Sequence, residues 1–83
     1  MESKMEARLK VRLDMIDSKI ASCTDRLEAL TKELKEAVAK YDTYQIVTFV
    51  PGYVRQIEEY KKELDALEEQ RRILAWVARE GDE

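Results

Sequence analysis

The chain lacks, or has very few of, several residue types on which catalytic and metal sites depend. Among 83 residues there is no histidine, one cysteine, one proline and two glycines. Without histidine, the commonest metal ligand and the commonest general base are missing. The glycines, Gly52 and Gly81, are too few and too far apart for a glycine-rich phosphate loop. We therefore expect no catalytic, cofactor-binding or metal site, and no enzyme activity.

The chain also lacks disulfide partners and long apolar runs. Cys23 stands alone, which fits a reducing compartment. The longest uncharged segment, 43–54, is short and contains Pro51 and Gly52, and the amino-terminal residues do not resemble a signal peptide. We expect a cytoplasmic protein with no membrane partner and no small-molecule substrate. We expect one domain, 1–83, in which a single copy would bury only a marginal core.

Charge is abundant but of mixed sign. Charged residues make up 40% of the chain and the net charge is −3. Binding to nucleic acid phosphates needs clustered lysine and arginine, so nucleic acid is a disfavoured partner. A composition rich in Glu, Lys, Arg, Leu and Ala, with little Gly and Pro, is typical of long helices.

The strongest pattern is an apolar seam that steps alternately by four and three residues. Such heptad spacing predicts helices that pack against each other along one stripe. The first half of the seam is Leu9, Leu13, Ile16, Ile20, Cys23, Leu27, Leu30, Leu34, Ala37, Tyr41 and Tyr44. The second half is Tyr53, Ile57, Tyr60, Leu64, Leu67, Arg71, Leu74 and Ala78. Cys23 lies within the seam, which favours a buried, inert thiol.

The seam and its interruption predict two helices. We expect the first over about 3–46, a turn over about 47–52, the second over about 51–79, and a short acidic tail, 80–83. Ser3 and Glu6 have capping-box spacing, Pro51 suits the first position of a helix, and Gly81 suits a carboxy-terminal cap. Because residues 41–54 are rich in β-formers, a short strand pair there is the alternative.

These boundaries predict an antiparallel hairpin in one of two registers, in which the numbers of facing residues sum to 94 or to 101. In both registers the second helix ends early, and Met5, Leu9 and Leu13 are left without a partner in the same chain. Ile73, Trp76 and Val77 lie off the main seam, and Trp76 occupies the heptad position most remote from it. Both features predict contact with another chain.

Two further features are candidates for interaction. Arg71 occupies a seam position, where it either extends its charge to solvent, fixes the register by pairing with an acid, or contacts nucleic acid. Phe49 and Val50 fall in the expected turn, where they either plug the hairpin tip or form a contact surface. The candidate interaction residues are Met5, Leu9, Leu13, Phe49, Val50, Arg71, Ile73, Trp76 and Val77.

The sequence thus predicts an all-α, antiparallel helical hairpin, similar to a coiled coil, that dimerises into a four-helix bundle. The predicted function is a non-catalytic protein–protein interaction module, such as a small assembly factor, a chaperone, or an oligomerisation or regulatory protein. Its predicted partners are a second copy of the chain and a helix of another protein. The alternative is a small nucleic-acid-binding regulator built on a hairpin dimer.

Overall fold

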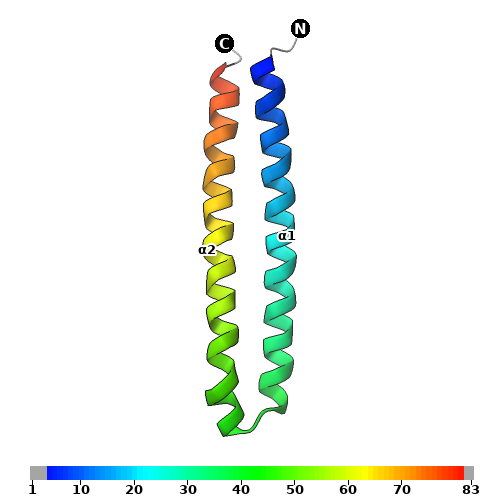
Figure 1. The fold of residues 1–83 in the computed structure, drawn as a ribbon, viewed down its shortest axis with the longest axis vertical. Helices are drawn as coiled ribbons and strands as arrows, with labels where there is room; N and C mark the ends of the chain where they lie inside the picture. Colours follow the sequence, from blue (N-terminus) through cyan, green and yellow to red (C-terminus); the bar gives the residue numbers. More distant parts are fainter. Residues whose placement is uncertain (1–3, 82–83) are drawn as a thin grey trace.

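The protein is a helical hairpin. A computed structural model describes residues 4–81, which form two helices, α1 (Lys4–Lys40) and α2 (Thr43–Gly81). The helices lie side by side and antiparallel, with the start of α1 and the end of α2 at one end of the rod (Figure 1). The rod measures 63 × 15 × 13 Å. The all-α antiparallel hairpin is therefore confirmed, and the alternative of a strand pair within 41–54 is wrong, because residues 43–54 are helical.

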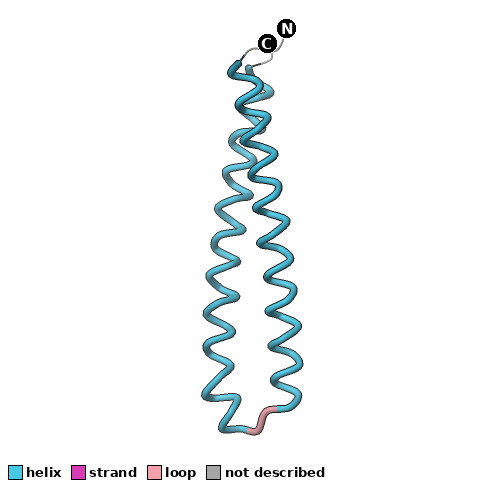
Figure 2. The backbone as a smooth tube through the Cα atoms, turned by 45° about the vertical axis from the view of Figure 1, so that its right-hand side comes forward, coloured by secondary structure: helices cyan, strands magenta, loops and turns pink. Residues whose placement is uncertain are grey.

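The turn lies earlier in the chain than the sequence predicts. α1 ends at Lys40 instead of about 46, and α2 begins at Thr43 instead of about 51. The connection is only Tyr41 and Asp42, seen as the short loop in Figure 2. At the far end, α2 continues to Gly81, and no described glycine has a positive φ, so the expected left-handed cap is not found. The expected cap at Ser3 lies outside the described residues.

A reciprocal capping box explains why the chain turns at this point. The Asp42 carboxylate accepts a hydrogen bond from the Gln45 backbone N–H (2.9 Å), and the Gln45 side-chain oxygen accepts one from the Asp42 N–H (3.1 Å). The first backbone bond of α2 follows, from the Ile46 N–H to the Asp42 carbonyl at 3.0 Å. These bonds satisfy donors that a helix start otherwise leaves unpaired. Asp42 therefore caps the amino terminus of α2, which begins at Thr43.

This cap can be tested by substitution. We expect Asp42→Ala to lower the free energy of unfolding by about 1 kcal/mol, because the Gln45 N–H loses its acceptor. Asp42→Ser is the matched control, since serine also caps helices. Thermal melts at one protein concentration measure both variants. Equal stability of Asp42→Ala and the unsubstituted protein would contradict the cap.

Pro51 and Gly52 lie inside α2, although their types suggest a turn. Proline has no N–H, so the carbonyl of Val47, four residues earlier, receives no helical hydrogen bond from it. A Cβ added to Gly52 would meet nothing within 4 Å. The helix therefore does not depend on a proline or a glycine at these two positions. It continues through both because the apolar seam continues across them. Ile46 and Val50, both half-buried, extend the spacing back from Tyr53.

Moving the turn changes the register of the hairpin. Two contacts between the helices define it: Cys23 with the carbonyl of Tyr60, and Asp17 with Arg71, whose residue numbers sum to 83 and 88. Between these two sums, a sum of 87 places seam residues of α1 level with seam residues of α2, as Leu30 with Ile57. The expected sums of 94 and 101 are both wrong. They exceed the observed register because the turn was placed too late.

The expected overhang of the first helix is consequently wrong as well. α1 has 37 residues and α2 has 39, so the two helices run alongside each other over their whole length. Leu9 and Leu13 are half-buried in the hairpin rather than bare. Met5 alone of the three remains largely exposed, at 73%.

The core is thin. Ile16, Cys23 and Leu30 are the only described residues that are buried, and all three lie on one stripe of α1. The other seam residues of both helices are half-buried, except Tyr44 and Arg71, which are exposed. Two helices can cover each other along only one line, so each seam side chain keeps one flank in solvent. The hairpin therefore offers long, partly apolar sides for further packing.

Candidate interaction surface

The candidate interaction residues fall at the two ends of the rod. One group lies at the open end, where α1 begins and α2 ends, and the other lies beside the turn (Figure 1). The open-end group is Met5, Leu9, Leu13, Arg71, Ile73, Trp76 and Val77. The turn group is Phe49 and Val50. The two groups lie too far apart along the rod to act as one site.

Arg71 pairs with an acid on the facing helix. Its Nε donates to Oδ1 of Asp17 at 2.5 Å, and both side chains are about half exposed, at 48%. Of the three interpretations of Arg71, this geometry matches pairing across the helix interface. An ion pair this exposed contributes only about 0–1 kcal/mol to stability. Its structural consequence is to link α1 and α2 at one register.

Three apolar side chains form a patch on the outside of α2. Ile73, Trp76 and Val77 are spaced i, i+3 and i+4, so they share one face of the helix. They remain exposed, Trp76 at 55%. A cluster of this kind, containing a tryptophan, is typical of interaction surfaces because Trp is enriched at interface centres.

Level with this patch, α1 carries a second apolar pair that sequence reasoning missed. Val11 and Met15 are four residues apart and are more than half exposed, at 57% and 55%. The register sets residue 11 level with residue 76 and residue 15 with residue 72. The signal was present in the sequence as an apolar i, i+4 pair off the seam. We name Val11, Met15, Ile73, Trp76 and Val77 the open-end patch.

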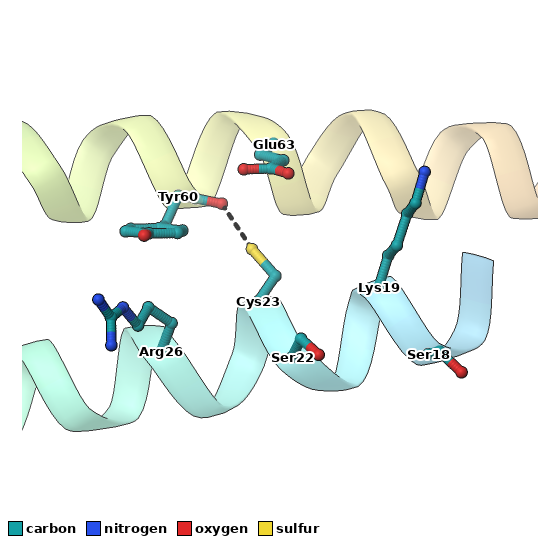
Figure 3. A pocket seen from close by; sticks show the side chains of 7 residues that line it. All are labelled: Ser18, Lys19, Ser22, Cys23, Arg26, Tyr60 and Glu63. Atoms are coloured by element: carbon teal, nitrogen blue, oxygen red, sulfur yellow. Dashed lines mark hydrogen bonds between the residues drawn. The ribbon is translucent and has the colours of Figure 1, made fainter. Parts of the chain in front are cut away.

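A shallow groove runs between the helices near the middle of the rod (Figure 3). It is lined by Ser18, Lys19, Ser22, Cys23, Arg26, Tyr60 and Glu63. At its base, the buried Cys23 thiol donates to the Tyr60 carbonyl oxygen at 3.2 Å. Burial, and secondly the negative charge of Glu63, raise the pKa of the Cys23 thiol. Because the thiolate is the reactive form, this thiol is poorly reactive.

The rim of the groove is charged, and the charge differs between the helices. Lys19 and Arg26 come from α1, and Glu63 comes from α2 (Figure 3). None of these three residues forms an ion pair within the part of the chain that the structure describes. The groove therefore presents a basic row on one helix and an acidic side chain on the other, both available for contacts.

The turn end holds a small aromatic contact. The rings of Tyr41 and Phe49 lie 5.7 Å apart between centroids, tilted by 50°. Tyr41 is half-buried, whereas Phe49 is half exposed, and Val50 is half-buried in the seam. Phe49 and Val50 thus belong to a helix that packs at the tip, and not to a loop.

The described residues contain no group of three or more side chains of His, Cys, Asp or Glu that could hold a metal ion. Neither helix, within residues 4–81, is long and apolar enough to cross a membrane. Comparison with protein-family models, with curated protein sequences and with solved structures gives no match.

Proposed function

We propose that this protein is a non-catalytic protein–protein interaction module that acts through helix–helix packing. Its first partner is a second copy of the same chain, with which it forms a four-helix bundle. In the cell, such a module serves as a small assembly factor, a chaperone, or an oligomerisation or regulatory protein, with another protein's helix as the further partner.

The amount of exposed surface is the observation that carries this proposal. The hairpin exposes 6917 Å² at a mass of 9.8 kDa. A compact monomer of that mass exposes about 5,200 Å². The excess is about 1,700 Å² per chain, or about 3,400 Å² for two copies, and obligate homodimers bury about 2,000 to 5,000 Å². One further hairpin is therefore enough to remove the excess.

The thin core supports the same conclusion. Only three described side chains are buried in the single hairpin, although apolar residues line the seam over the whole rod. Each large apolar side chain gains about 1.5 to 3 kcal/mol when it moves from water to full burial. A second hairpin packed on one side would bury the exposed flanks of the seam residues.

Nucleic acid has less support as a partner. Arg71 and Arg72 at the open end are already paired, with Asp17 and Glu69 respectively. Lys19 and Arg26 share their groove with Glu63. Phosphate binding needs a surface dominated by positive charge, and these neighbouring carboxylates reduce it.

Sedimentation equilibrium at micromolar concentration tests self-association. We expect a mass close to twice 9.8 kDa. The melting temperature should also rise with protein concentration, because dimerisation favours the folded state by mass action. A mass of 9.8 kDa across the whole concentration range would contradict the homodimer and leave a different protein as the partner.

A further inference from the structure

We propose that two hairpins pack through the groove side with their turns at the same end. In this arrangement, Ile73, Trp76 and Val77 of each copy cover Val11 and Met15 of the other. The proposal rests on the self-association described above and names its interface and orientation.

The groove and the open-end patch lie on one side of the rod. In helices packed as a coiled coil, residues seven apart occupy the same side. Ser22 of α1 and Glu63 of α2 both line the groove. Met15 lies one heptad before Ser22, and Val77 lies two heptads after Glu63. The charged groove is therefore continued by apolar residues toward the open end.

The rest of the patch adjoins these two residues. Ile73 lies two heptads after Glu59, which lines a second shallow groove with Glu63. Trp76 follows Ile73 by three residues, and Val11 precedes Met15 by four. Those spacings place Trp76 and Val11 at the edge of the patch, on the outer flanks of their helices.

Two copies that face each other through this side can be related by two kinds of two-fold axis. With the axis along the rod, α1 of one copy lies on α2 of the other and both turns are at the same end. With the axis across the rod, α1 lies on α1, α2 lies on α2, and the turns are at opposite ends.

Charge favours the axis along the rod. In that arrangement the register sets Glu63 of one copy level with residue 24 of the other, between Lys19 and Arg26. With the axis across the middle of the rod, residue 22, at the centre of α1, faces residue 22 of the other copy. Lys19 then lies near Arg26 of the other copy, and like charges repel.

The apolar residues favour the same axis. With the turns together, Val11 and Met15 of one copy are level with Trp76 and residue 72 of the other, on adjacent helices. The exposed side chains of the open-end patch then bury each other. With the turns at opposite ends, the patches of the two copies lie at opposite ends of a 63 Å rod and remain in water.

Distances between spin labels test the orientation. We would place one label per chain at the turn, as Thr43→Cys, or at the open end, as Lys4→Cys, in a Cys23→Ala background. Both positions are exposed. Helices in a bundle lie about 8–10 Å apart, so turns at the same end predict label distances below roughly 35 Å at both positions. If Cys23→Ala fails to fold, the unsubstituted background serves, because the buried Cys23 thiol resists labelling.

The outcomes separate the two proposals. Short distances at both positions in a dimer support the shared orientation. A dimer with distances of about 50 Å or more at both positions overturns the orientation, since both labels lie near the ends of a 63 Å rod, but leaves self-association intact. A monomer overturns both. Long distances at the turn and short ones at the open end overturn the side-by-side packing.

Substitution of the tryptophan gives a second, independent test. We expect Trp76→Ala to weaken dimerisation by about 30-fold or more, because each dimer loses two interface tryptophans. Tyr44→Ala is the matched control, since Tyr44 is an exposed aromatic residue at the turn end, away from the patch. Concentration-dependent sedimentation measures both. An unchanged dissociation constant for Trp76→Ala would overturn the interface, as would an equal loss in the control.

Discussion

Replacing Pro51 with alanine is expected to raise the free energy of unfolding by up to about 3 kcal/mol. Pro51 lies inside α2, where its ring opposes helical geometry and its nitrogen donates no hydrogen bond. Alanine restores a donor for the carbonyl of Val47. The residue is exposed, so no packing is lost. Thermal or urea unfolding at one fixed protein concentration measures the change.

Gly52→Ala is the companion variant, with an expected gain of about 0.5–1 kcal/mol. A Cβ at this position meets nothing within 4 Å, and alanine loses less conformational entropy on folding. Both gains depend on a helix that passes through 51 and 52. A fall in stability for both variants would mean that these residues form a turn, and it would contradict the register of the hairpin.

Leu30→Ala is expected to lower the free energy of unfolding by about 2–5 kcal/mol, far more than truncation at any exposed position. Leu30 is 8% exposed and is one of three buried side chains among the described residues. For so small a domain this is a large part of the total stability. The melting temperature measured by circular dichroism should fall by many degrees.

Val38→Ala on the same helix is the matched control, because Val38 is 42% exposed. Substitutions at exposed positions usually change stability by no more than about 0.5 kcal/mol. A melting temperature of Leu30→Ala that differs by only a degree or two from that of Val38→Ala would show that Leu30 is not in the core.

The heptad seam made the hairpin predictable. Apolar residues at spacings of four and three, from Leu9 to Ala37 and from Tyr53 to Ala78, specify helices that pack along one stripe. The two helices take up almost the whole chain, so within one chain each helix can pack only on the other. Burial of Ile16, Cys23 and Leu30 follows from the same spacing, because all three occupy the same heptad position near the middle of the rod.

The turn was misplaced because two local signals competed. Pro51-Gly52 is a strong indicator of a turn, whereas Asp42 and Gln45 form a capping box that starts a helix nine residues earlier. Packing of the seam favours the earlier helix start. Ile46 and Val50 carry the seam onto α2, so a turn at 51 would remove both from it.

The misplaced turn also explains the errors at the open end. It shortened the second helix and left Met5, Leu9 and Leu13 without partners, whereas the full-length α2 half-buries Leu9 and Leu13. Trp76 was recognised from its place off the seam and is indeed exposed. The sequence alone does not relate Val11 and Met15 to Trp76, because that relation depends on the register of the two helices in the folded hairpin.

Small-angle X-ray scattering of the unsubstituted protein tests side-by-side self-association most directly, because one profile reports mass and length together. We expect a mass near twice 9.8 kDa and a longest dimension close to that of one hairpin, whose rod is 63 Å long. Two hairpins packed along their sides double the mass without lengthening the particle. A mass of one chain, or a doubled mass in a particle of about twice the length, would contradict the account.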